Sequence, residues 1–277
     1  MIELLKAALF GIVEGITEWL PVSSTGHMIL LDEFVSLQVS PLFLQMFMVV
    51  IQLGAILAVI IMYWKTIWPV RKDRKTGKYR IDRDIISLWG KVIAACLPAA
   101  AVGILADDWL DVHFRNWVVV SIMLILVGAA FIVIENRNRG RKPVTRRLHD
   151  ISLREAMIIG LFQLIAAIFP GTSRSGATIL GSIMIGVSRP AAAQFTFIMA
   201  IPVMLGASLI KILKYGLFFS GMELAILLTG MIVAFLVSVL VIRFIMRYIK
   251  THDFKIFGWY RIILGIVVII YFAIIRR

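Results

Sequence analysis

Two carboxylates near the N-terminus lie in a segment that is otherwise apolar. Glu14 and Glu18 are four residues apart in GIVEGITEWLP, so an α-helix places both on one face. An ionised carboxylate at the centre of a bilayer is unfavourable by at least about 2.5 kcal/mol, and two neighbouring ones also repel each other. We therefore predict a catalytic pair that either binds a divalent cation, Mg²⁺ or Ca²⁺, or shares a proton; a position at the water interface is the alternative.

Hydroxyl groups and a histidine follow this acid pair directly. The stretch PVSSTGH begins with Pro21, which ends a helix, and continues with small polar residues that cap the next helix. Free N–H groups and hydroxyls at such a break suit an anion. His27 is expected in the first helical turn, where the helix dipole favours a neutral imidazole; a hydrogen-bonding core histidine is the alternative. We predict that Ser24 and His27 take part in catalysis, and that Ser23 and Thr25 bind the substrate.

A second break carries an arginine. The stretch PGTSRSGAT, residues 170–178, combines glycines, hydroxyls and the guanidinium of Arg174. The planar fork of arginine matches phosphate oxygens, and an unpaired arginine inside a membrane is strongly unfavourable. We predict that Arg174 is catalytic; a purely structural ion pair with one of the two glutamates is the alternative. The residues predicted to bind substrate beside it are Gly171, Ser173, Ser175 and Thr178.

The chain that must position these groups has the composition of a membrane protein. Of its 277 residues, 61% are hydrophobic and 16% are charged, and the mean hydropathy is +0.95. Soluble domains are roughly 45–50% apolar and about 25% charged. Six stretches have the roughly 20 apolar residues that a membrane crossing needs. They are residues 42–64, 85–106, 117–134, 191–213, 224–242 and 256–275.

The two segments that carry the motifs differ from simple crossings. Residues 4–20 and 156–169 each end at a proline followed by small polar residues, after which an apolar course resumes. Helix, break, helix is the pattern of a re-entrant hairpin, because irregular backbone at membrane depth must be satisfied by protein or by a wet cavity. We therefore predict an all-α polytopic membrane protein with six transmembrane helices plus two re-entrant helical hairpins.

The two halves of the chain also resemble each other. Aligning Gly11 with Gly160 brings the prolines of the two breaks into register and places Ser24 on Ser173 and Thr25 on Arg174. An odd number of crossings in each half would invert the second copy. The prediction is an inverted-topology repeat within a single membrane domain, 1–277. Its halves are about 1–136 and about 150–277.

Charge predicts the orientation. The net charge of +13 comes from basic residues in short loops, which is typical of topology-setting loops rather than of nucleic-acid binding, so we expect no nucleic-acid partner. Loops 65–83 and 137–149 are predicted to be cytoplasmic. A turn with Asp107, Asp108 and Asp111 and both chain termini are then external, although Arg276 and Arg277 count against the latter. The lone cysteine, Cys96, excludes an intramolecular disulfide.

Two weaker features have structural interpretations that involve no chemistry. The G-x-x-x-G spacing of Gly11 and Gly15 predicts close helix packing rather than chemistry. The charged residues Lys91, Lys211 and Arg261 fall near the ends of crossings, where we expect their side chains to snorkel toward water.

The motifs EGITEWLPVSSTGH and PGTSRSGAT resemble the two signature segments of the bacterial undecaprenyl-diphosphate phosphatase family linked to bacitracin resistance, and the resemblance covers essentially the whole chain. It implies hydrolysis of undecaprenyl diphosphate to undecaprenyl phosphate and inorganic phosphate. It also implies divalent-metal dependence and a site at the outer face of the bacterial cytoplasmic membrane, where the lipid carrier of peptidoglycan synthesis is recycled. The family's functional residues carry over to Glu14, Glu18, Ser23, Ser24, Thr25, His27 and Arg174.

Several points stay open at the level of sequence. The nucleophile is His27, Ser24 with His27 as base, or a water activated by His27 and a glutamate. Inverted repeats with broken helices are also a transporter design, so a transporter or a polyprenyl-phosphate flippase is the alternative function. The expected partners are a polyprenyl diphosphate and membrane lipids, and a homodimer is among the assemblies that the sequence allows.

Overall fold

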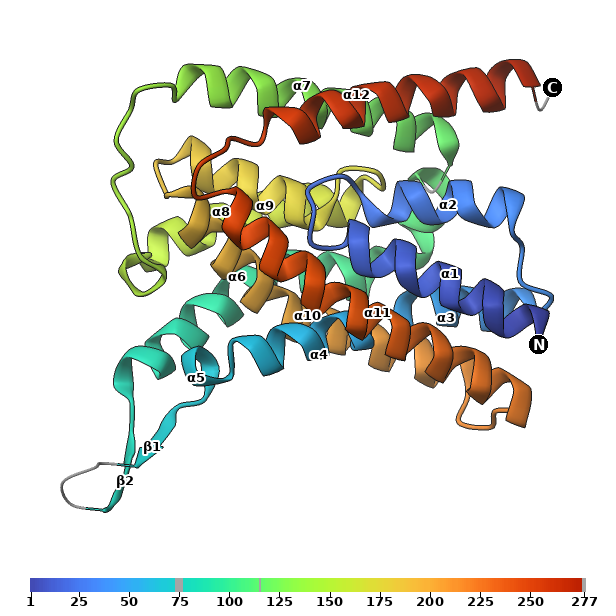
Figure 1. The fold of residues 1–277 in the computed structure, drawn as a ribbon, viewed down its shortest axis with the longest axis horizontal. Coiled ribbons are helices and arrows are strands. Elements are labelled where there is room, and N and C mark those ends of the chain that lie inside the picture. The colour runs from blue at the N-terminus through green and yellow to red at the C-terminus, as the bar shows by residue number, and fades with distance from the viewer. Residues whose placement is uncertain (73–76, 115, 276–277) are drawn as a thin grey trace.

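The computed structural model describes residues 1–72, 77–114 and 116–275, and this part of the chain folds into helices and one short β-hairpin (Figure 1). The long helices run along the longest axis of the molecule, with the N-terminus at one end and the β-hairpin at the other. In chain order the elements are α1 Ile2–Thr17, α2 Ser24–Phe34, α3 Pro41–Val50, α4 Gln52–Met62, α5 Trp64–Ile67, β1 Val70–Lys72, β2 Tyr79–Ile81, α6 Arg83–Phe114, α7 Trp117–Arg137, η1 Leu148–Asp150, α8 Leu153–Ile168, α9 Arg174–Met184, α10 Arg189–Tyr215, α11 Gly221–Tyr248, α12 Lys255–Ile270 and η2 Tyr271–Ile275.

Six helical stretches in the described part of the chain are long and apolar enough to cross a membrane, which confirms the predicted number. The first combines α3 with α4, and the last combines α12 with most of η2. The six are Pro41–Met62, Arg83–Ala106, Trp117–Arg137, Arg189–Tyr215, Gly221–Tyr248 and Lys255–Ile274.

The predicted acidic turn is wrong. Helix α6 continues through Asp107, Asp108 and Asp111 and ends at Phe114. Aspartate lowers helix propensity by only about 0.7 kcal/mol relative to alanine, and neither glycine nor proline interrupts residues 104–114. The helix therefore continues through the positions of the three acids. Arg276 and Arg277, which count against an external C-terminus, lie outside the described residues.

The basic segment 65–83 contains short regular structure where the sequence indicates only a loop. Strands β1 and β2 pair antiparallel, with Val70 opposite Ile81 and Lys72 opposite Tyr79, and every residue of both strands is exposed. Figure 1 shows this hairpin projecting beyond the helical body.

Glycines bring helices from the two halves into close contact. Helix α1 packs on α11, and α8 packs on α6. A Cβ atom on Gly11 would lie 2.5 Å from the carbonyl oxygen of Gly230, and one on Gly160 would lie 2.3 Å from that of Ala95. Both distances are too short for a side chain, so the packing role predicted for Gly11 is confirmed. Each of the first helices of the two halves is thus held by a helix of the other half.

Two breaks interrupt the helices that carry the motifs. The first break, residues 18–23, joins α1 to α2, and the second break, residues 169–173, joins α8 to α9. In Figure 1 both lie near the middle of the molecule, with α1 and α2 extending toward one end and α8 and α9 toward the other. The first break touches the start of α9, because the Ser175 hydroxyl donates to the Glu18 carbonyl oxygen at 3.0 Å.

Candidate active site

Each break ends in a strained serine that caps the next helix. Ser23 and Ser173 have φ values of 75° and 69°, and they are the only residues other than glycine with positive φ in the described part of the chain. Their hydroxyls accept hydrogen bonds from the backbone N–H groups of Gly26, at 3.3 Å, and Gly176, at 3.0 Å. Such backbone conformations are unfavourable for residues with side chains and are concentrated at functional sites.

The capping geometry differs from the register of the internal alignment. Ser23 and Ser173 both occupy the capping position of the following helix, whereas the sequence alignment places Ser24 on Ser173. The chain takes two residues from Pro21 to its cap but three from Pro170 to its cap, so the register changes by one within the break. Arg174 therefore corresponds to Ser24, the first residue of α2.

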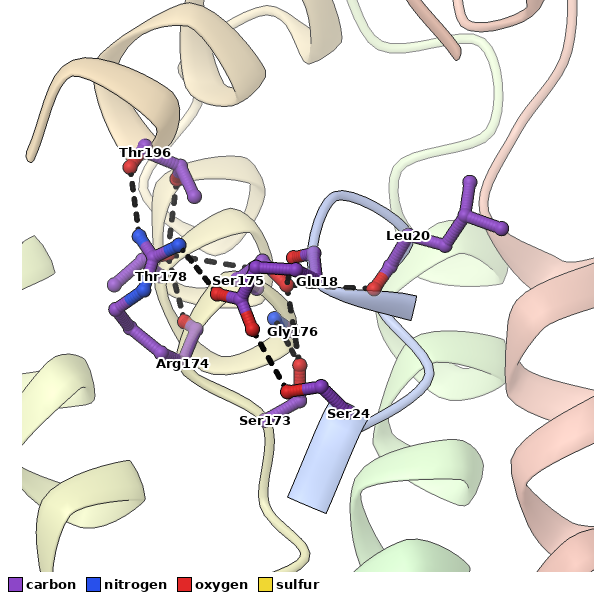
Figure 2. Close-up of polar contacts among 9 residues, drawn as sticks. All are labelled: Glu18, Leu20, Ser24, Ser173, Arg174, Ser175, Gly176, Thr178 and Thr196. Atoms are coloured by element: carbon purple, nitrogen blue, oxygen red, sulfur yellow. Dashed lines mark hydrogen bonds and ion pairs between the residues drawn. The ribbon is translucent and has the colours of Figure 1, made fainter. Parts of the chain in front are cut away.

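The Glu18 carboxylate joins the two breaks (Figure 2). Its Oε2 atom accepts from the Ser24 hydroxyl at 2.7 Å, and its Oε1 atom accepts from Nη2 of Arg174 at 2.9 Å. Only 5% of Glu18 is exposed, so little water competes for these contacts. Charge-assisted hydrogen bonds in such surroundings are strong, and they fix the serine oxygen relative to the guanidinium.

Helix α10 holds the other side of the guanidinium. Nη1 of Arg174 donates to the carbonyl oxygen of Thr196 at 2.9 Å, and the Thr196 and Thr178 hydroxyls lie 2.9 Å apart. The Thr178 hydroxyl also donates to the Arg174 carbonyl oxygen at 2.9 Å. The buried Nε of Arg174 has no partner among the described residues. Arg174 is thus fixed at two nitrogens, and its Nε–H group makes no hydrogen bond within the described part of the chain. Thr196, in an apolar crossing, carried no sequence signal.

Glu14 lies one helical turn before Glu18 and is fully buried. Neither carboxylate oxygen has a hydrogen-bond partner among the described residues. A buried ionised carboxylate without partners is strongly unfavourable, so Glu14 requires a proton or a bound cation. The described residues hold no group of three or more His, Cys, Asp or Glu side chains that could bind a metal. An acid pair still fits Mg²⁺, which keeps several waters and takes substrate phosphate oxygens as ligands.

His27 faces helix α12 rather than the acids. Its Nδ1 atom lies 2.7 Å from the Ser23 carbonyl oxygen, and its Nε2 atom lies 2.7 Å from the Tyr260 hydroxyl. Among the contacts of the described residues, none joins the imidazole to Ser24 or to either glutamate. The expectation that His27 lies in the first turn of its helix is confirmed, since α2 begins at Ser24.

Arg261 binds carbonyl groups of both breaks. The prediction that its side chain snorkels toward water is therefore wrong. Arg261 is fully buried and donates from Nη1 to the Pro21 carbonyl oxygen at 3.2 Å. Nη2 donates to the carbonyl oxygens of Gly171 and Thr172 at 2.8 and 2.9 Å. The breaks leave these carbonyl groups without helical partners, so a guanidinium inside the protein is better satisfied than one reaching for water. A charge within a crossing was the available sequence signal.

Of the remaining predicted residues, Ser173, Ser175 and Gly171 lie in or beside the second break, and Thr25 lies apart from it. Ser175 bonds to the first break, and its hydroxyl lies 3.2 Å from that of Ser173, so both belong to the contact between the breaks. Gly171 has a φ of 89°, and a Cβ atom there would lie 2.6 Å from the Val120 carbonyl oxygen. The side chain of Thr25 is exposed and takes part in none of the contacts described above.

An apolar groove of about 480 Å³ passes beside the histidine. Its walls come from α1 and the first break on one side and from α11 and α12 on the other. The lining includes Val13, Leu20, His27, Phe244, Ile256 and Tyr260.

Comparison with known proteins identifies close relatives. A family model described as Bacitracin resistance protein BacA matches residues 7–267, which include both breaks. A protein of Enterococcus faecalis is 59% identical over 273 residues, covering 99% of this chain and 98% of its own. A protein of Desulfitobacterium hafniense is 58% identical, covering 99% of this chain and 97% of its own, and one of Acetivibrio thermocellus is 55% identical over the full length of both. All three relatives are named undecaprenyl-diphosphatase.

Proposed function

Because the chain belongs to the Bacitracin resistance protein BacA family, we propose that it hydrolyses undecaprenyl diphosphate to undecaprenyl phosphate and inorganic phosphate. The observation that carries the proposal within the molecule is the Glu18 carboxylate, which holds a serine hydroxyl and an arginine together. Phosphoryl transfer depends mainly on positioning and on neutralising charge, and this set supplies both.

The diphosphate binds at Arg174 and the second break. The free Nε–H of Arg174 is a donor for a phosphate oxygen, and the hydroxyls of Ser173 and Ser175 lie at the same helix start. The N-terminal end of α9 adds the positive end of its dipole. Substrate binding weakens the ion pair between Arg174 and Glu18, because the phosphate oxygens compete with the carboxylate for the N–H groups of the guanidinium.

Ser24 is the nucleophile in this scheme. Its oxygen forms a bond to the terminal phosphorus while its proton passes to Glu18, which already accepts that hydroxyl at 2.7 Å. The bond from this phosphorus to the bridging oxygen breaks, and undecaprenyl phosphate leaves. A water oxygen then bonds to the phosphorus of the phosphoserine, and the water proton passes to Nε2 of His27. The bond from phosphorus to the Ser24 oxygen breaks, Glu18 returns its proton to that oxygen, and inorganic phosphate leaves.

A divalent cation bound by Glu14 and Glu18 completes the proposed site. It would neutralise phosphate charge that Arg174 alone does not balance. The partnerless oxygens of the buried Glu14 support a cation there, and a proton shared by the pair is the competing state.

The prenyl chain lies in the apolar groove beside His27, which keeps the chain in lipid-like surroundings while the diphosphate reaches the breaks. Ile256→Trp narrows the groove, whereas Ile263→Trp changes an equally exposed residue of α12 outside it. We expect Ile256→Trp to raise KM for undecaprenyl diphosphate about fivefold and to leave KM for farnesyl diphosphate unchanged. Equal effects of the two variants contradict this assignment.

We also propose that α1–α2 and α8–α9 are re-entrant hairpins of an inverted repeat, with the site open to the outer face of the cytoplasmic membrane. The exchanged packing of α1 on α11 and of α8 on α6 supports the repeat. The positions of the two basic loops support the orientation, since Lys91, two turns into the helix that follows the β-hairpin, donates to the His149 carbonyl oxygen at 3.2 Å.

A transporter is the alternative that the repeat suggests, but the names of the relatives favour the phosphatase. Purified protein in detergent separates the two functions, since no membrane remains to be crossed. Phosphate release from undecaprenyl diphosphate in detergent supports the phosphatase. Movement of the lipid in proteoliposomes without any phosphate release contradicts it.

A further inference from the structure

We propose that Tyr260 is a positioning residue, whose hydroxyl holds His27 in one tautomer with Nε2 unprotonated and facing a fixed direction. The proposal rests on the function proposed above, in which Nε2 accepts a proton from the attacking water. Tyr260 lies in α12, far along the chain from both motifs, and joins the site only through the fold.

The contacts of the imidazole determine which nitrogen carries the proton. Nδ1 faces the Ser23 carbonyl oxygen at 2.7 Å, and a carbonyl oxygen can only accept, so Nδ1 is the donor. In a neutral ring Nε2 is then the acceptor, and the Tyr260 hydroxyl, 2.7 Å away, is its donor. The two rings are parallel within 1°, with 5.6 Å between their centroids. Both nitrogens and the ring plane are thus fixed.

The surroundings of the imidazole favour this neutral form. Partial burial of the ring disfavours its charged state, and the positive charge of Arg261, the buried residue after Tyr260, also opposes a second cation nearby. The other residues that line the groove beside His27, Thr17, Leu20 and Tyr248 among them, are uncharged. The contact with Ser23 depends in turn on the strained backbone of that residue, which directs its carbonyl group at the ring.

The hydroxyl acts before proton transfer and not during it. Tyr260 occupies the Nε2 lone pair until the attacking water replaces it as donor. The water proton then moves to Nε2 while the water oxygen bonds to phosphorus, and the Tyr260 O–H bond stays intact. Without the hydroxyl, only the Ser23 contact holds the ring, so the imidazole can rotate away from that carbonyl group and then carry its proton on Nε2. In either state it cannot accept the proton of the attacking water.

The test compares Tyr260→Phe with Tyr248→Phe, which removes a hydroxyl from the same groove without touching His27. Full-length protein labelled with ¹⁵N-histidine is reconstituted in nanodiscs, and His27→Gln identifies the His27 signals. We expect wild-type protein and Tyr248→Phe to show Nδ1 protonated and Nε2 unprotonated. Tyr260→Phe should show a mixture of tautomers, a kcat about tenfold lower and a KM within about twofold of the wild-type value.

A wild-type tautomer and a wild-type kcat in Tyr260→Phe would overturn the proposal. If Tyr260→Phe does not fold, 3-fluorotyrosine at position 260 replaces it, because its more acidic hydroxyl strengthens the same hydrogen bond. A displaced Nε2 resonance then supports the contact, and an unchanged one overturns it. The tautomer measurement needs no substrate, so its failure is distinct from a wild-type protein that releases no phosphate, which would contradict the proposed function instead.

Discussion

Glu18 and Arg174 are 156 residues apart in the chain, and their side chains form an ion pair of 2.9 Å with only 6% and 12% of their side-chain surface exposed. The pair links the first break to the second, so neither motif forms the site alone. The Ser24 hydroxyl donates to the same carboxylate. Glu18 therefore positions the proposed nucleophile, and the substrate-binding Arg174 holds Glu18 in place.

Replacing Arg174 by Lys should lower kcat/KM by about 10²–10³. The charge remains, but one ammonium group cannot reach both Glu18 and Thr196 and also bind a phosphate oxygen. Phosphate release from undecaprenyl diphosphate is the measurement. The matched control is Arg243→Lys, an exposed arginine of α11, which should keep turnover within about twofold of wild type. Turnover near the wild-type value in Arg174→Lys counts against the role of the arginine.

Glu14 is expected to govern the metal requirement. EDTA should abolish phosphate release, and Mg²⁺ or Ca²⁺ should restore it. In Glu14→Gln the concentration of Mg²⁺ that gives half-maximal activity should rise at least about tenfold, because one of two anionic ligands is lost. The thermal midpoint in the absence of metal should not fall, since a buried carboxylate without partners becomes neutral. The exposed Asp150→Asn serves as control, and activity unaffected by EDTA would leave a shared proton as the state of the acid pair.

The sequence predicted those features that depend on composition and local pattern. Apolar length identified the six crossings, and the two motifs identified Glu18, Ser24 and Arg174 as neighbours. Tyr260 was missed because its role arises from the packing of α12 against the first break, which no local pattern encodes. Arg261 was assigned to the end of a crossing, although a charge within a crossing is itself a signal, because its partners are carbonyl groups that only the fold brings near. The direction of His27 was missed for the same reason.

Arg261 should stabilise the fold of both breaks. In Arg261→Gln the three carbonyl groups of the breaks, and that of Met123, lose a charged donor, so the free energy of unfolding should fall by about 1–3 kcal/mol. Unfolding of the detergent-solubilised protein is the measurement, with the exposed Arg243→Gln as control. Equal stability of the two variants would show that the buried guanidinium does not hold the breaks.

Two single cysteines test the orientation in the membrane. The variants are Phe218→Cys and Tyr79→Cys, each in a Cys96→Ala background. Phe218 lies between α10 and α11 and is 97% exposed, and Tyr79 lies on the basic β-hairpin and is 76% exposed. A maleimide that cannot cross membranes should label position 218 from outside intact cells, and position 79 only after permeabilisation. Labelling of position 79 alone in intact cells would invert the topology.

Hydrolysis by the Glu18, Ser24 and Arg174 cluster is tested most directly by phosphate release from undecaprenyl diphosphate, measured with purified wild-type protein and Ser24→Ala in detergent. Ser36→Ala, which removes the hydroxyl of an exposed serine just after α2 and outside the site, is the matched control. We predict steady release by wild type and by Ser36→Ala, and a loss of at least about 10³-fold in Ser24→Ala, with the variant still folded. Near-normal release by Ser24→Ala would contradict the account.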